Sequence, residues 1–161
     1  HGNRDFLVSK KICKDLNIHL MIDPYIITHN DIKILLLHGD TLCTDDKAYQ
    51  DFREMVRSKN WQNEMLSKTL EERLFLADNL RKKSIAANKE KGEDIMDVNN
   101  HEINKIIEEY SPDIIIHGHT HRPNVHKHNK VKRYVLGDWY DSFYILSLKD
   151  NKFTINKGRL K

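Results

Sequence analysis

The sequence predicts an α/β fold with a helical insertion. Two short apolar runs, 32–37 and 113–116, are expected to be strands buried on both faces, because hardly any polar residue interrupts them. Each run leads directly into a His-Gly pair. Between them lies a polar segment, 47–91, that contains neither Gly nor Pro and has helical periodicity. Buried strands separated by such a segment are typical of an α/β core that carries a helical cap.

The flanking elements follow from similar patterns. The run 97–110 predicts an amphipathic helix, which Pro112 ends. A shorter helix is expected over 6–16, and a hairpin turn at Asn151-Lys152. Further strands are expected at 18–22, 24–28, 134–136, 143–148 and 153–155.

Composition limits the classes of function. Of the 161 residues, 39% are hydrophobic and 32% are charged, which is typical of one soluble globular domain. The formal net charge of +3 is too small to indicate nucleic-acid binding. Cys13 and Cys43 lack the spacing of a metal or disulfide motif, so a reducing compartment is expected. No apolar run approaches the roughly 20 residues that cross a bilayer, so any membrane contact should be peripheral.

The first residues form a turn that no strand precedes. His1-Gly2-Asn3 has the Gly-containing pattern of a tight loop at the end of a strand. We therefore expect the sequence to be a fragment that lacks its N-terminal strands.

The two His-Gly pairs are the strongest chemical signal. His38 and His117 follow the buried strands, and the C-terminal ends of strands in α/β sheets are where ligands collect. His117 and His119 lie two residues apart, so both can reach a cluster of ions from one loop. Imidazoles combined with oxygen ligands suit Mn, Fe, Ni or Zn better than Ca, and Asn3 offers an amide oxygen.

A single histidine at a strand end is more often a polar cap than a ligand. Here two strands repeat the pattern, which favours metal binding. His121 is interpreted as shaping the loop, and His126 and His128 as solvated residues.

Several motifs resemble the calcineurin-like metallophosphoesterases. Gly2-Asn3, His38-Gly39 and Gly118-His119-Thr120-His121 resemble the later motifs of that superfamily. Its two earlier motifs, an Asp-x-His and a Gly-Asp ahead of the Gly-Asn, have no counterpart here. Longer matches resemble one of its families, the UDP-2,3-diacylglucosamine pyrophosphohydrolases of lipid A biosynthesis. These matches lie in order along the chain, at 1–7, 38–46, 95–99, 117–123 and 136–139.

The resemblance implies a β-sandwich flanked by helices (α-β-β-α), a single domain over 1–161 with its cap at about 47–92. It implies hydrolysis of the diphosphate of UDP-2,3-diacylglucosamine to UMP and 2,3-diacylglucosamine 1-phosphate by two Mn²⁺ ions. The expected enzyme is a monomer that binds no nucleic acid. It would be peripheral on the cytoplasmic face of the bacterial inner membrane, where its lipid-linked nucleotide substrate lies.

The resemblance also assigns metal ligands. It gives Asn3, His38 and His117 to one metal and His119 to the other, whose remaining ligands would lie upstream. The fragment alone is therefore expected to bind metal poorly and to be inactive. The catalytic residues would be His117 and Arg4, whose forked guanidinium suits the substrate diphosphate.

The cap would bind the rest of the substrate. Ser84, Asn88 and Lys91 fall at i, i+4 and i+7, so one helix can point them at one ligand. Spacing alone favours a solvated helix face, and only the resemblance reverses that preference. Together with the loop positions, the substrate-binding residues implied by the resemblance are Asn3, Arg4, Asp46, Ser84, Asn88, Lys91 and His117.

Two alternatives stay open. One is a calcineurin-like phosphodiesterase with another nucleotide substrate. The other is a non-catalytic remnant, against which the retained histidines argue.

Overall fold

The structure is a computed structural model that describes residues 1–90, 92 and 95–160. The chain divides into two compact units. Unit 1 joins His1–Leu42 to Val98–Lys161, and unit 2 is Cys43–Asp97. Unit 2 contains the polar helical segment, whereas unit 1 contains both His-Gly pairs.

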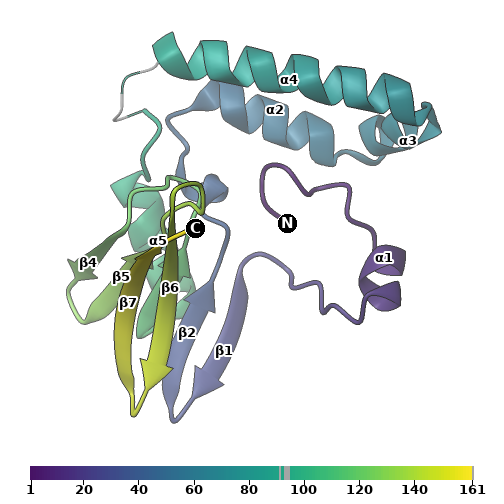
Figure 1. The fold of residues 1–161 in the computed structure, drawn as a ribbon. Coiled ribbons are helices and arrows are strands. Elements are labelled where there is room, and N and C mark those ends of the chain that lie inside the picture. Colours follow the sequence, from purple (N-terminus) through teal and green to yellow (C-terminus); the bar gives the residue numbers. More distant parts are fainter. Residues whose placement is uncertain (91, 93–94, 161) are drawn as a thin grey trace. The chain divides into compact units, whose positions relative to one another are not determined.

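Unit 1 is built on a mixed sheet with the strand order β1-β2-β3-β5-β4 (Figure 1). Strands β2, β3 and β5 are parallel, and β1 and β4 pair antiparallel at the edges. Because β2 and β3 run in the same direction, the residues that follow them meet at one edge of the sheet. The strands are β1 (Tyr25–His29), β2 (Ile32–Leu36), β3 (Ile114–His117), β4 (Asn124–His128) and β5 (Val131–Val135).

A helix covers one face of this sheet and a hairpin covers the other (Figure 1). Helix α5 (Asn100–Tyr110) packs against the face that carries Leu35 and Ile115. The hairpin of β6 (Ser142–Lys149) and β7 (Lys152–Arg159) packs against the face that carries Ile34 and Ile114. Neighbouring residues of a strand point to opposite faces, so β2 and β3 must be apolar throughout. The prediction that both strands are buried on two faces is confirmed.

Helix α5 also agrees with the sequence. It begins after Asn99, whose side chain accepts a hydrogen bond from the backbone N–H of His101 at 2.8 Å. It ends at Ser111, which adopts a left-handed conformation directly before Pro112. Ile103 on its inner face is fully buried.

Three predictions for unit 1 were wrong in detail. Helix α1 covers only Lys10–Asp15, because Ser9 caps it and fixes its start. Residues 18–22 form no strand, and their apolar side chains are largely exposed. Strand β4 was missed, because Asn-Val-His-Lys-His has almost no apolar residues to alternate.

Unit 2 consists of helices in its described part. They are α2 (Lys47–Arg57), α3 (Lys59–Ser67) and α4 (Leu70–Glu90). Asp46 caps α2, and Ser58 caps α3 by accepting a hydrogen bond from the backbone N–H of Trp61. Val56 and Met65 are buried. None of the described helices in either unit combines the length and the apolar character needed to cross a membrane.

The leucines of α4 differ in burial. Leu70 and Leu74 are 64% and 62% exposed. Leu76 and Leu80 are half-buried. Apolar residues occur almost all around this helix, so periodicity alone does not select a face.

Candidate metal centre

Two histidines from different strands meet at the edge of the sheet. His38 follows β2 and His119 lies in the loop after β3, and the Nδ1 of His119 is 3.2 Å from the Nε2 of His38. Their rings are edge to face, with centroids 5.0 Å apart. The backbone N–H of Gly118 donates to the carbonyl of His38 at 3.0 Å, which ties the two turns together. The two His-Gly pairs of the sequence therefore do form one site.

The geometry of this pair fits a metal centre. The two ring nitrogens are 3.2 Å apart, so both side chains can reach neighbouring ions of one centre. Imidazole suits Zn, Fe and Ni, and oxygen ligands suit Mn. Among the described residues, no three His, Cys, Asp or Glu side chains surround a common point. The described chain thus offers a histidine pair, to which an amide or other groups must be added.

The turn after β2 places His38. Its backbone N–H donates to the Oδ2 of Asp23 at 2.8 Å. Gly39 has φ +108°, a conformation that favours glycine. A Cβ on Gly2 would be 2.9 Å from the Cε1 of His38, so the backbone of Gly2 lies against this ring. The loop that carries Asn3 therefore reaches the histidine pair.

His117, assigned above as a metal ligand, is engaged by protein groups. Its side chain is 1% exposed. Arginine has only donors, so the Nη1 of Arg133, 2.9 Å from the Nε2 of His117, donates to it. The Nδ1 of His117 is 3.0 Å from the carbonyl of Gly118. Both ring nitrogens thus lie near protein groups, and the assignment of His117 as a metal ligand stays a prediction.

The same loop continues to His121, which ends the Gly-His-x-His pattern at 118–121. His119 and His121 both have left-handed backbones, with φ +64° and +54°. The Nδ1 of His121 is 3.4 Å from the Oδ2 of Asp138. The interpretation of His121 as a loop-shaping residue stays a prediction.

Arg4 lies at the rim of the same site. Its Nη1 donates to the hydroxyl of Tyr140 at 3.4 Å, and the side chain is exposed. The ring of Tyr140 is 6.4 Å from that of His121. An exposed guanidinium beside the histidine loop is accessible to a phosphate group. Its assigned role in substrate binding stays a prediction.

The predicted substrate-binding residues of unit 2 differ in their structural positions. Asp46 caps helix α2, where its Oδ1 accepts a hydrogen bond from the backbone N–H of Tyr49 at 3.1 Å. Ser84 is an exposed residue of α4. The side chain of Asn88 and the whole of Lys91 lie outside the described residues. The role of all four residues stays a prediction.

Sequence reasoning missed Arg133, which is 4% exposed on β5. It also interpreted His126 and His128 as solvated, whereas both are half-buried on β4. The Nε of Arg133 donates to the Nε2 of His128 at 3.2 Å. The pairing of β4 with β5 places His126 opposite Arg133. The alternation of His126 and His128 was the available sequence signal for burial of one strand face. It could not be interpreted because β4 was not predicted.

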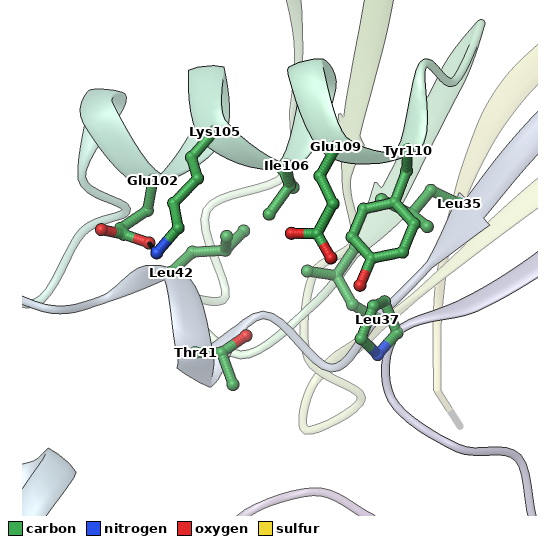
Figure 2. A pocket seen from close by; sticks show the side chains of 10 residues that line it. Leu35, Leu37, Thr41, Leu42, Glu102, Lys105, Ile106, Glu109 and Tyr110 are labelled. Atoms are coloured by element: carbon green, nitrogen blue, oxygen red, sulfur yellow. Dashed lines mark ion pairs between the residues drawn. The ribbon is translucent and has the colours of Figure 1, made fainter.

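A cavity of about 180 Å³ lies elsewhere in unit 1, between α5 and the end of β2 (Figure 2). Leucines form part of its wall, and Glu102 and Lys105 form an ion pair of 3.7 Å at its margin. A hydrogen bond to Glu109 raises the pKa of Tyr110, another lining residue. None of the predicted metal or substrate residues lines this cavity, so it is separate from the metal centre.

Comparison with known proteins extends this picture. The sequence pattern of the calcineurin-like phosphoesterase family matches residues 1–123, which include Asn3, both His-Gly pairs and the whole Gly-His-x-His motif. The chain belongs to this family.

Two curated relatives are named UDP-2,3-diacylglucosamine hydrolase. The one from Bordetella pertussis is 44% identical over 142 residues, which are 86% of this chain and 55% of the relative. The one from Haemophilus influenzae is 43% identical over 143 residues, 89% of this chain and 60% of the relative. The chain thus spans little more than half the length of the relatives it matches. Among solved structures, an archaeal phosphodiesterase has a TM-score of 0.46 at 15% identity, over 94% of this chain and 59% of its own.

Proposed function

We propose that the complete protein containing these residues hydrolyses the diphosphate bond of UDP-2,3-diacylglucosamine with the help of bound metal ions. The products would be UMP and 2,3-diacylglucosamine 1-phosphate. The meeting of His38 and His119 at 3.2 Å is the observation that carries the metal-dependent chemistry. The substrate is taken from the relatives of 43–44% identity that are named for it.

The proposed protein ligands are His38, His117 and His119, together with the amide oxygen of Asn3. Nitrogen and oxygen donors suit Mn²⁺, which we propose as the metal. Bound metal ions supply an activated water and neutralise the attacked phosphoryl group. The protein's own task is to hold these donors rigidly at the sheet edge.

Arg4 is proposed to bind the diphosphate. Guanidinium pairs with phosphate through two parallel hydrogen bonds. Its hydrogen bond to Tyr140 is long and exposed, so exchanging it for a phosphate costs little. The side chain would thereby offset the negative charge of the substrate at the rim of the metal centre.

Unit 2 is proposed to bind the acylated part of the substrate through Asp46, Ser84, Asn88 and Lys91. A lipid-linked substrate also implies peripheral contact with the cytoplasmic face of the inner membrane. The basic run 81–83 would support such contact, since each basic residue near an anionic surface contributes about 1 kcal/mol. We propose that the enzyme acts there as a monomer.

The test is hydrolysis by the complete protein. UMP release from UDP-2,3-diacylglucosamine should require Mn²⁺ and stop when a chelator is added. His38→Ala and His119→Ala should each lose more than the roughly 10–100-fold that removing an outer partner of a metal ligand costs. His101→Ala is the matched control, because His101 is exposed on α5 and distant in sequence from both turns. Chelator-resistant hydrolysis, or full activity in His38→Ala, would overturn the proposal.

A further inference from the structure

Two exposed aromatic residues lie in the loop between β5 and β6. Trp139 and Tyr140 are 59% and 60% exposed, although Trp is highly buried on average in folded proteins. The loop itself is held against β6, because the indole N–H of Trp139 donates to the backbone carbonyl of Tyr144 at 3.1 Å. A Cβ on Gly137 would clash with the ring of Tyr144, so the backbone of Gly137 also packs there. Tyr140 is therefore presented by a loop that is anchored to the hairpin.

The two aromatic rings have different neighbours. The ring of Trp139 lies 6.0 Å from that of Phe143, which is part of the hairpin. The hydroxyl of Tyr140 instead accepts a hydrogen bond from the Nη1 of Arg4 at 3.4 Å. Its ring lies 6.4 Å from that of His121. Tyr140 is thus the aromatic residue that lies beside the arginine proposed to bind the diphosphate.

This position suits the nucleoside half of the proposed substrate. In a UDP-linked substrate the base is separated from the diphosphate by one ribose. A phosphate held by Arg4 therefore brings the base near the side chain whose hydroxyl contacts Arg4. Aromatic side chains bind bases by stacking, and a tyrosine loses little conformational freedom when it does so.

We propose that Tyr140 binds the nucleobase of the substrate by stacking, while Arg4 holds the diphosphate. This inference rests on the proposed function and deepens it, since it gives the UMP half of the substrate a binding residue of its own. Every base has a flat face of π electrons, so stacking on Tyr140 strengthens nucleotide binding without selecting uracil. CMP should therefore depend on Tyr140 to about the same extent as UMP.

The test compares two ligands in the complete protein by calorimetry. UMP and ribose 5-phosphate share the phosphate and the sugar, but only UMP has a base. Tyr140→Leu should weaken the binding of UMP roughly 5- to 150-fold and leave that of ribose 5-phosphate unchanged. Tyr140→Phe keeps the ring and loses the hydroxyl, so it should keep the wild-type affinity for UMP.

Trp139→Leu is the matched control. It removes an equally exposed ring from the same loop, and this ring lies toward Phe143. The variant should bind UMP as the wild type does. Thermal unfolding establishes that each variant is folded, which the exposure of Tyr140 favours.

The outcomes separate stacking from a role through Arg4. An equal loss of affinity for UMP and ribose 5-phosphate in Tyr140→Leu, or a loss for UMP in Tyr140→Phe, would overturn the stacking role. A loss in Trp139→Leu as large as that in Tyr140→Leu would do the same.

The outcomes also separate this inference from the proposed function. A complete protein that does not hydrolyse UDP-2,3-diacylglucosamine contradicts the proposed function, even where UMP binding depends on Tyr140. A protein that hydrolyses it, but whose Tyr140→Leu variant keeps the wild-type KM and UMP affinity, contradicts the stacking role alone.

A second measurement needs no variant. NMR of the wild-type protein with UMP should show nuclear Overhauser effects between the uracil protons and the ring protons of Tyr140. Their presence at the ring of Trp139 instead would overturn the inference.

Discussion

His128 shows how one side chain makes stability depend on pH. Its pKa is lowered from the ordinary value of 6.5, mainly by burial and further by the charges of Arg133 and His126. The folded protein thus resists protonation of a group that the unfolded chain protonates readily. Between pH 6.5 and the lower pKa of the folded state, the unfolded chain binds more protons, so stability falls as the pH falls through this window.

We expect His128→Gln to reduce this pH dependence. The amide oxygen of Gln can accept the hydrogen bond from Arg133 but does not titrate. Denaturant unfolding at pH 7.5 and 5.5 should show a smaller loss of unfolding free energy on acidification in His128→Gln than in the wild type. His29→Gln, at an exposed histidine of β1, should keep the full dependence. If His128→Gln loses as much unfolding free energy on acidification as the wild type, other groups cause the pH dependence.

At this scale the sequence predicted part of the site. His38 and His119 were identified because each follows a buried strand through a Gly-containing turn, which is a local pattern. The contact of His117 with Arg133 was not predictable, because it joins residues of two strands whose pairing the sequence does not show.

Among the elements, helix α2 shows how capping and substrate binding can be distinguished. The side chain of Asp46 accepts a hydrogen bond from the backbone N–H of Tyr49. Asn and Asp stabilise a helix about equally well at this N-cap position. Asp46→Asn should therefore keep stability, and Asp46→Ala should lose about 1 kcal/mol of unfolding free energy.

The KM of the Asp46→Asn variant tests whether Asp46 also binds substrate. If the carboxylate also binds substrate, Asp46→Asn should raise KM for UDP-2,3-diacylglucosamine while thermal stability stays at the wild-type level. Equal KM in wild type and Asp46→Asn would contradict the substrate-binding role of Asp46.

Elements were predictable where a local signal was complete. Helix α5 has a cap, an apolar face and a closing proline, and β2 and β3 are continuous apolar runs. Strand β4 lacked this signal, because its place in the sheet comes from pairing with β5. The inner face of α4 was ambiguous for the opposite reason, since apolar residues surround the helix.

For the whole molecule, the fold class follows from the order of elements, whereas the strand order does not. Parallel pairing of β2 with β3 brings together residues about 80 positions apart, across the entire insertion. Burial on both faces indicated central strands, but either edge strand was compatible with the sequence. Only the three-dimensional pairing shows that β5 lies next to β3 and that Arg133 thereby reaches His117.

The left-handed backbones of His119 and His121 have a consequence for overall stability. A non-glycine residue in this conformation costs roughly 1–2 kcal/mol, which glycine avoids. His121→Gly should therefore have an unfolding free energy about 1 kcal/mol higher than His121→Ala, as measured by denaturant unfolding. Equal stability of the two variants would show that the loop relaxes out of this conformation. Glycine would suit both backbone positions, so the two histidines cost this loop stability that a glycine-containing loop would keep.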